Sequence, residues 1–303
     1  MKPILLHFDG LWGVELPAYL TMLMFGFFAA MLVARKDGEA AGMDRVAIVD
    51  LGIFVLVTGV IGARVLAVLS DGFLSDFIHL CTDPTLVDPI DTSVTYCAQN
   101  SDCGQGYLCN LDARDAVYAG TQRSMCYPPR DCLAALKFWQ GGLTFYGGIL
   151  LAVPAGFWFA KRRGLSPMRA ADVMAPALML GLAFGRVGCF LNGCCYGAAT
   201  ESVFGVRFPK LFADRHPTQL YESLFALSLF FVLRYLIAKR TRGAGELSGW
   251  MLGIYGVFRI AIETLRDDAR GALGPLSTSQ LISIPLIALG VFLVWRARRN
   301  LQG

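Results

Sequence analysis

Residues 185–197 read GRVGCFLNGCCYG and close a long apolar stretch of the chain. The segment puts Arg186, Asn192 and three cysteines where lipid contact is expected. A charged side chain at membrane depth is costly, so it usually faces a cavity, a partner or a ligand. The four glycines of the segment allow helix backbones to come close or to unwind. The segment therefore predicts one wall of a site inside a membrane.

The composition of the whole chain is that of an integral membrane protein. Of its 303 residues, 55% are hydrophobic and 17% are charged, whereas a soluble domain carries about 25% charged residues. The net charge of +4 is concentrated at the ends of apolar stretches. This pattern indicates membrane topology and argues against a nucleic-acid partner. The N-terminus lacks the order of regions that marks a removable signal peptide.

Seven apolar stretches approach the ~20 residues that span a bilayer. They comprise residues 16–34, 46–69, 143–160, 171–190, 219–238, 247–265 and 279–295. Lys and Arg cluster at the ends of the first, third, fifth and seventh stretches, and the positive-inside rule assigns that side to the cytoplasm. We therefore expect an all-α polytopic membrane protein with about seven transmembrane helices, its N-terminus outside and its C-terminus cytoplasmic.

The exported loop between the second and third stretches is rich in cysteine. We divide the chain into residues 1–69, this insertion at 70–138, and residues 139–303, which carry the main site segments. An even number of cysteines in an exported polar segment predicts a disulfide-stapled loop, and three bridges have fifteen possible pairings. A metal site is the disfavoured alternative, because no histidine lies among these cysteines. The disulfide candidates are Cys81, Cys97, Cys103, Cys109, Cys126 and Cys132.

Two further segments are polar where apolar residues are expected. Residues 139–148 read WQGGLTFYGG, and their glycine pairs predict a re-entrant or unwound backbone, which is tolerated only beside a cavity. An interfacial aromatic belt with Trp139 and Tyr146 is the alternative. Residues 216–222 read HPTQLYE and place Glu222 one turn inside a helix. That carboxylate either belongs to a site or complements the helix dipole. His216 is either a base or a surface histidine.

The sixth apolar stretch carries a polar stripe. Tyr255, Arg259, Glu263 and Arg266 follow one another at helical spacing and share one face. Arg259 and Glu263 are placed to pair at i, i+4, either as a structural pair or as part of a polar cavity.

Arginines recur in three of the apolar stretches. Arg64 adds a cation in the second, so Arg64, Arg186 and Arg259 are predicted to share one enclosed volume, partly compensated by Glu222 and Glu263. Guanidinium suits bidentate recognition of phosphate, and the nearest abundant phosphate belongs to a phospholipid headgroup.

Taken together, these segments resemble the prolipoprotein diacylglyceryl transferase family of the bacterial inner membrane. The resemblance rests on residues 139–148, 185–197, 216–222 and 255–266 and excludes the cysteine-rich insertion. It implies transfer of the diacylglyceryl group of phosphatidylglycerol to the lipobox cysteine thiol of a prolipoprotein signal peptide, with release of glycerol phosphate. The partners are then this lipid, the precursor and the surrounding membrane lipids. No cofactor and no metal are implied.

The resemblance also implies roles for individual residues. Arg186 would hold the phosphatidylglycerol headgroup and Arg259 would act at the reacting centre. Tyr146 stands where many members of the family have a histidine proposed as the base, so it is either the base or a hydrogen-bonding partner of the lipid. The remaining substrate-binding candidates are Tyr19, Arg64, Asn192, Gly197, Glu222, Tyr255 and Glu263.

The chain departs from the family at its cysteines. Cys189 and Cys194 replace an asparagine and an acidic residue of other members. Three alternative functions are a diverged transferase with another acceptor, a membrane thiol-redox protein using Cys194 with Cys195 or Cys189, and a transporter. Adjacent cysteines rarely form an unstrained disulfide, and no internal repeat typical of transporters is visible. The lipid transferase is therefore the leading hypothesis.

Overall fold

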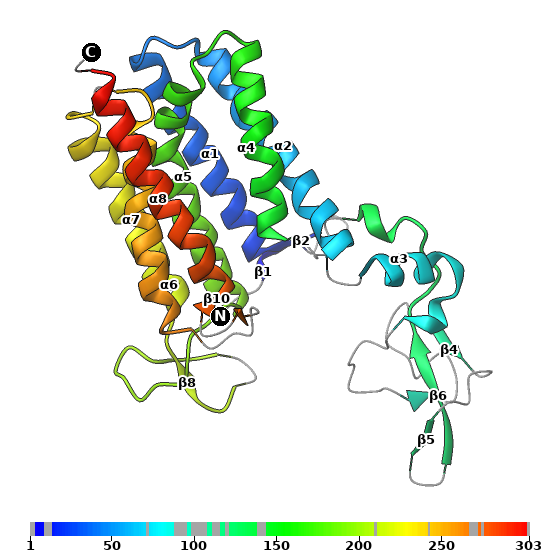
Figure 1. Cartoon of the computed structure of the whole chain (residues 1–303). Helices are drawn as coiled ribbons and strands as arrows, with labels where there is room; N and C mark the ends of the chain where they lie inside the picture. The colour runs from blue at the N-terminus through cyan, green and yellow to red at the C-terminus, as the bar shows by residue number, and fades with distance from the viewer. Residues whose placement is uncertain are drawn as a thin grey trace. The chain divides into compact units, whose positions relative to one another are not determined.

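In a computed structural model the chain forms two compact units, and each is described by itself (Figure 1). One unit comprises residues 1–52 and 160–303, and the other comprises residues 53–159. The described residues are 4–8, 14–70, 73–87, 96–97, 108–110, 116–118, 121–137, 144–208, 211–241, 243–266, 272–273 and 276–301. The division into units runs through two long helices, α2 (Arg45–Ser70) and α4 (Phe145–Arg162). The predicted boundaries at residues 69 and 138 remain predictions.

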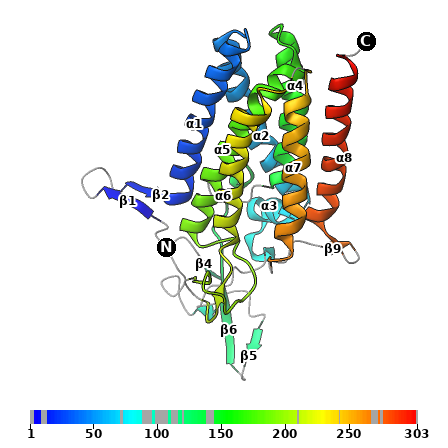
Figure 2. The ribbon, with the colours of Figure 1, turned by 90° about the vertical axis from the view of Figure 1, so that its left-hand side faces the viewer.

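The first unit is a helical bundle. It contains α1 (Ala18–Ala40), α5 (Pro167–Asn192), α6 (Thr218–Phe231) with a π-helical continuation at Val232–Ile237, α7 (Glu246–Glu263) and α8 (Thr278–Arg299). Short antiparallel pairs join β1 (Ile4–Phe8) with β2 (Val14–Pro17), β7 (Val206–Arg207) with β8 (Asp214–Arg215), and β9 (Ala272–Leu273) with β10 (Leu276–Ser277). Helix α5 packs against α1, α6 and α7, and α7 packs against α8 (Figure 2). Helix α5 is therefore central to the unit.

Apolar side chains lie both inside and outside this bundle. Met179, Leu229 and Leu233 are buried at the contact of α5 with α6. Large apolar side chains on α1 face outward instead, and Phe25 and Leu32 are 57% and 67% exposed. A soluble protein would cover such a surface, whereas lipid solvates it. The expectation of an all-α membrane protein is confirmed at this level.

Five helices in the described part of the chain are long and apolar enough to cross a membrane. They are Ala18–Ala40, Arg45–Leu69, Pro167–Asn192, Thr218–Ile237 and Thr278–Arg299. Helices α4 and α7 also form where the sequence predicts spans, and each has 18 residues. Their composition is less apolar because α4 ends on two basic residues and α7 carries Arg259 and two glutamates. The count of seven spans therefore stays a prediction.

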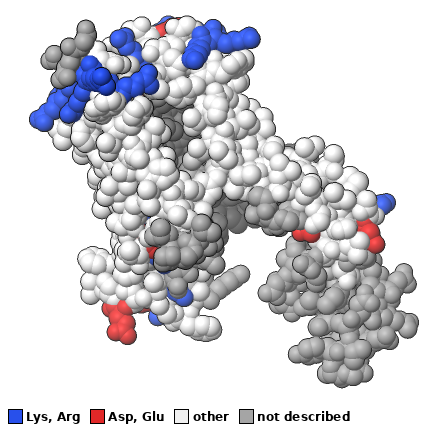
Figure 3. Space-filling model, in the orientation of Figure 1, with Lys and Arg blue, Asp and Glu red and all other residues white. Residues whose placement is uncertain are grey.

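Lys and Arg side chains gather at one end of the helical bundle, where the C-terminus lies (Figure 3). These residues include Arg35 and Lys36 near the end of α1, Arg169 near the start of α5, and the basic last turn of α8. The basic clusters that follow alternate apolar stretches in the sequence thus correspond to one basic end of the bundle.

The second unit shows why Gly147 and Gly148 follow Tyr146. Both glycines lie in the first turns of α4, so the prediction of an unwound backbone is wrong for them. A Cβ atom at Gly147 would lie 2.3 Å from the carbonyl oxygen of Gly62 on α2. The pair allows two helices to pack at close range, as small residues do in membranes. Residues 139–143, with Trp139, lie outside the described residues.

The rest of the second unit holds the cysteine-rich insertion. It contains α3 (Phe73–Thr82), 3₁₀ turns at Pro84–Leu86 and Ala134–Leu136, and β6 (Thr121–Tyr127). Strand β6 pairs antiparallel with β3 (Tyr96–Cys97), β4 (Leu108–Asn110) and β5 (Ala116–Tyr118).

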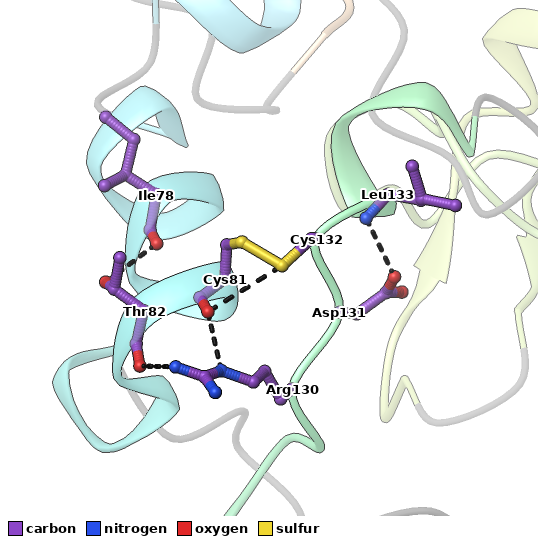
Figure 4. The surroundings of a disulfide bond; sticks show 7 residues. All are labelled: Ile78, Cys81, Thr82, Arg130, Asp131, Cys132 and Leu133. Carbon is purple, nitrogen blue, oxygen red and sulfur yellow. Dashed lines mark hydrogen bonds between the residues drawn. A yellow bond between two sulfur atoms is a disulfide. The ribbon is translucent and has the colours of Figure 1, made fainter.

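A disulfide joins Cys81 at the end of α3 to Cys132 (Figure 4). Beside it, the Arg130 guanidinium donates hydrogen bonds of 2.6 Å to the carbonyl oxygens of Cys81 and Thr82, which lack helical partners at this helix end. Cys109 and Cys126 are also disulfide-bonded. The Cys97 side chain and Cys103 lie outside the described residues, so the three-bridge framework remains a prediction.

Candidate active site

Glu222 lies at the centre of a buried cluster of charges in the first unit. It stands one turn inside α6, and only 1% of its surface is exposed. One of its carboxylate oxygens lies 2.6 Å from Nε of Arg186 on α5. The other accepts from Arg266 at 2.7 Å and from Arg259 on α7 at 3.4 Å. Three guanidinium groups from two different segments therefore share one carboxylate.

A second carboxylate completes the cluster. Glu263 pairs with Arg259 at 3.0 Å, so the pair expected from the i, i+4 spacing on α7 is confirmed. The same Arg259 nitrogen, Nη2, also donates to Ser279 Oγ, in the first turn of α8, at 3.1 Å. All five charged side chains are at least 84% buried, since Arg186, the most exposed of them, is 16% exposed. Three positive and two negative charges leave an excess of one positive charge.

The cluster lies near the helix ends that are opposite to the Lys and Arg surface of Figure 3. Arg186 stands six residues before the end of α5 at Asn192, which is about 9 Å along the helix axis. Glu222 stands four residues after the start of α6 at Thr218, which is about 6 Å. The charges are thus placed one to two turns inside the bundle.

The chain that follows α5 is clamped against the start of α6. The carbonyl oxygen of Cys194 accepts from Gln219 Nε2 at 2.6 Å, and that of Cys195 accepts from Thr218 Oγ1 at 3.0 Å. Both donors are fully buried. Cys195 has a φ of 64°, which lies in the left-handed region that residues other than glycine rarely adopt. These two hydrogen bonds offset the backbone strain of Cys195.

At Gly197 the loop after α5 comes close to the backbone of His216 and Leu265. Its amide donates to the carbonyl oxygen of His216 at 2.8 Å, and the next amide donates to that of Leu265 at 2.9 Å. A Cβ atom at position 197 would lie 2.4 Å from the Leu265 oxygen. Gly197 therefore joins the loop after α5 to the end of α7, beside Arg266.

The three remaining cysteines form a second cluster beside the charges. The sulfur atoms of Cys189, Cys194 and Cys195 lie within 4.8 Å of one another, and all three residues are half-buried. The Cys194 and Cys195 sulfurs are 3.7 Å apart. Hydrogen bonds from the thiols of Cys189 and Cys194 lower the pKa of the Cys195 thiol, and the positive charges of Arg186 and Arg266 act in the same direction.

Other predicted site residues surround the two clusters. Tyr255 on α7 interacts with Arg186 and Glu222. Tyr19 on α1 packs against Gly188 of α5, is 38% exposed, and has the three cysteines and Arg186 as electrostatic neighbours. Asn192 is exposed at the end of α5, where it contacts Cys194.

Two predicted residues belong to the second unit. The Arg64 guanidinium donates hydrogen bonds of 2.8 and 2.7 Å to the carbonyl oxygens of Ala135 and Ala134. It also lies over the Phe77 ring at 5.1 Å. Tyr146 is half-buried in the first turn of α4, with its ring edge-on to Phe145. In the first unit, Arg266 is the third arginine of the cluster, beside Arg186 and Arg259. Arg64, which the sequence predicts in that place, donates to backbone carbonyl oxygens within the second unit.

Four residues of the site were missed as candidates. Arg266 belongs to the polar stripe predicted for the sixth apolar stretch, and Thr218 and Gln219 belong to the segment HPTQLYE, so the sequence carries a signal for each. Ser279 carries no such signal, because its polar side chain is one of several in the capped first turn of α8.

Comparison with known proteins gives a consistent match. A sequence model described as prolipoprotein diacylglyceryl transferase matches residues 3–86 and 117–296, and it leaves unmatched only part of the predicted insertion between them. Relatives that bear the name phosphatidylglycerol–prolipoprotein diacylglyceryl transferase include the following three. The protein of Vibrio parahaemolyticus is 40% identical over 177 residues, which cover 56% of this chain and 64% of the relative. That of Rickettsia bellii is 39% identical over 166 residues, 52% of this chain and 63% of the relative. The Clostridium tetani protein is 28% identical over 298 residues, which cover 96% of both chains.

Proposed function

The chain belongs to the prolipoprotein diacylglyceryl transferase family, and on this basis we propose that it is a phosphatidylglycerol–prolipoprotein diacylglyceryl transferase. It transfers the diacylglyceryl group of phosphatidylglycerol to the lipobox cysteine thiol of prolipoproteins, the first step of bacterial lipoprotein maturation. The observation that carries the proposal is the buried cluster of Arg186, Arg259 and Arg266 around Glu222.

The proposed topology has seven spans in the bacterial inner membrane. The Lys and Arg residues at one end of the bundle support a cytoplasmic location for that end and for the C-terminus. The charge cluster then lies in the outer half of the bilayer, and the insertion at residues 70–138 faces the oxidising side. The disulfide between Cys81 and Cys132 supports this location.

The charge of the cluster suits the phosphodiester of the lipid. An excess of one positive charge in a buried site is costly unless an anion compensates it. The phosphodiester of phosphatidylglycerol carries one negative charge and accepts bidentate hydrogen bonds from guanidinium. Glu222 holds the three guanidinium groups in place, so Arg186 and Arg259 are pre-organised to receive the phosphate.

In the proposed reaction the sulfur of the acceptor cysteine attacks the glyceryl carbon next to the phosphate. A carbon–sulfur bond forms while the carbon–oxygen bond to the phosphate breaks, and the electron pair leaves with glycerol phosphate. Negative charge therefore grows on the phosphate, where guanidinium groups oppose it. Arg259 is assigned to this reacting centre, and Arg186 to holding the headgroup.

The remaining predicted residues line the proposed substrate site. Tyr255 and Glu263 position the arginines that they contact, and Tyr19 and Asn192 border the loop after α5. Gly197 keeps that loop against Arg266. Tyr146 and Arg64 remain proposed as contributions of the second unit, Tyr146 as base or lipid partner and Arg64 as a lipid contact.

The experiment is the transfer of a labelled diacylglyceryl group from phosphatidylglycerol to a lipobox peptide by the purified protein in detergent. Arg186→Ala and Arg259→Ala should each abolish transfer. Arg234→Ala is the matched control, because Arg234 pairs with Asp37 at 2.6 Å in the same bundle and is 19% exposed. Retained transfer in both site variants would refute the proposal. Loss in the control alone would do the same.

A further inference from the structure

The proposed reaction leaves the three free thiols of Cys189, Cys194 and Cys195 without a task. It also requires a means of deprotonating the acceptor thiol. A free cysteine thiol has a pKa of about 8.5, so only about 3% of it is thiolate at pH 7. The thiol cluster lies next to the arginines that receive the phosphate, since Arg186 stands one helical turn before Cys189. The unused thiols therefore lie beside the proposed phosphate site, where the acceptor thiol has to be deprotonated.

The three sulfur atoms are held by a built framework. Cys189 projects from the last turn of α5, and Gly193 ends that helix with a φ of 75°. Cys194 and Cys195 then turn back, and the fully buried side chains of Gln219 and Thr218 fix their carbonyl oxygens. The left-handed backbone of Cys195 is a cost that this framework sustains. It results in three thiols that face one another.

The spacing of the sulfurs matches that of ligands to zinc. Zinc–thiolate bonds measure about 2.3 Å, so two tetrahedral sulfur ligands lie about 3.8 Å apart. The sulfurs of Cys194 and Cys195 are 3.7 Å apart, and all three lie within 4.8 Å. Closing the longest gap takes about 1 Å, which rotation of one side chain supplies. Three soft ligands select a thiophilic cation and leave the fourth tetrahedral position open.

We propose that Cys189, Cys194 and Cys195 bind a zinc ion whose fourth position takes the sulfur of the acceptor cysteine. The sequence alone led us to expect no metal here. The second half of this inference rests on the proposed transferase function. On binding zinc the acceptor thiol releases its proton to solvent and becomes a thiolate. That sulfur then forms the bond to the glyceryl carbon, the phosphate leaves with the electron pair of the broken bond, and the thioether product dissociates from zinc.

The first test is the metal content of the full-length protein. The protein is purified in detergent under reducing conditions, loaded with zinc, and freed of loosely held metal. We expect about one zinc per chain, and a sulfur-to-metal absorption band when cobalt replaces zinc. Cys189→Ser, Cys194→Ser and Cys195→Ser should each lose both signals, whereas Arg234→Ala keeps them. Folded wild-type protein that binds no zinc, or whose three thiols are lost to a disulfide, overturns the inference.

The second test separates the metal site from the transferase function. Removal of zinc from the wild-type protein with a chelator should lower transfer about 30-fold at pH 7, which is the ratio of full to 3% thiolate, and zinc alone should restore it. A lipobox peptide should shift the cobalt band, whereas the same peptide with serine should not. Undiminished transfer without zinc overturns the inference and leaves the proposed function standing. No transfer by zinc-loaded protein that still gives the cysteine-dependent shift refutes the proposed function and supports the metal site.

Discussion

Substitution of Glu222 by glutamine tests whether one carboxylate organises the arginine cluster. The change keeps the shape of the side chain and removes its charge, which leaves three guanidinium groups with Glu263 alone. Contacts at 2.6 and 2.7 Å join Glu222 to Arg186 and Arg266, and Glu222 is 1% exposed. Removal of one partner of a buried ion pair costs about 3–5 kcal/mol. We therefore expect Glu222→Gln to lower the apparent melting temperature by on the order of 10 °C.

The assay is thermal unfolding in detergent, with Asp37→Asn as the control. Asp37 pairs with Arg234 at 2.6 Å, but the two side chains are 23% and 19% exposed, so the control should lose about 1 kcal/mol. Addition of Arg266→Gln to Glu222→Gln restores the original excess of one positive charge. The double variant should recover part of the stability while transfer stays low. Equal stability of Glu222→Gln and the control would refute the reasoning, as would a double variant less stable than Glu222→Gln.

Three further predictions concern single positions. Tyr146→Phe should reduce transfer at least tenfold if the hydroxyl is the base, and full activity of this variant in the transfer assay would exclude that role. Gly197→Ala should destabilise the bundle by about 1–3 kcal/mol in thermal unfolding, because its Cβ atom would lie 2.4 Å from the Leu265 oxygen; an unchanged melting temperature would contradict the packing described. Replacing Cys81 and Cys132 by serine opens a loop with a sequence separation of 51 residues, so the second unit should lose about 4 kcal/mol, measured by proteolysis of the insertion. Unchanged protease resistance would show that this bridge does not stabilise the insertion.

Much of the bundle follows from hydropathy and charge. Apolar stretches of the right length predict helices, and the stripe on α7 predicts that Arg259 and Glu263 meet, which they do at 3.0 Å. These inferences use only the period of a helix. The position of Glu222 inside α6 is likewise predicted by the sequence. A carboxylate one turn past Pro217 is costly in a membrane unless it has a partner.

Contacts between segments far apart in the sequence could not be predicted from hydropathy and charge. The sequence offers several arginines for the site, and hydropathy does not decide among them. Arg266 follows α7 after two residues of turn, yet its side chain is only 2% exposed and pairs with Glu222. The glycines after Tyr146 show the same limit, since the packing of Gly147 against Gly62 and of Gly148 against Gly59 depends on the partner helix. The gathering of three thiols depends on the left-handed turn at Cys195, for which the sequence carries no glycine.

The most direct test of the transferase account is the stoichiometry of the reaction products. Phosphatidylglycerol and a lipobox peptide are incubated with the purified protein, and mass spectrometry quantifies the modified peptide and the released glycerol phosphate. The account predicts a thioether on the cysteine that carries the intact diacylglyceryl group, with one glycerol phosphate released for each. An acyl group alone on the cysteine, or thioether formation without glycerol phosphate, would contradict it.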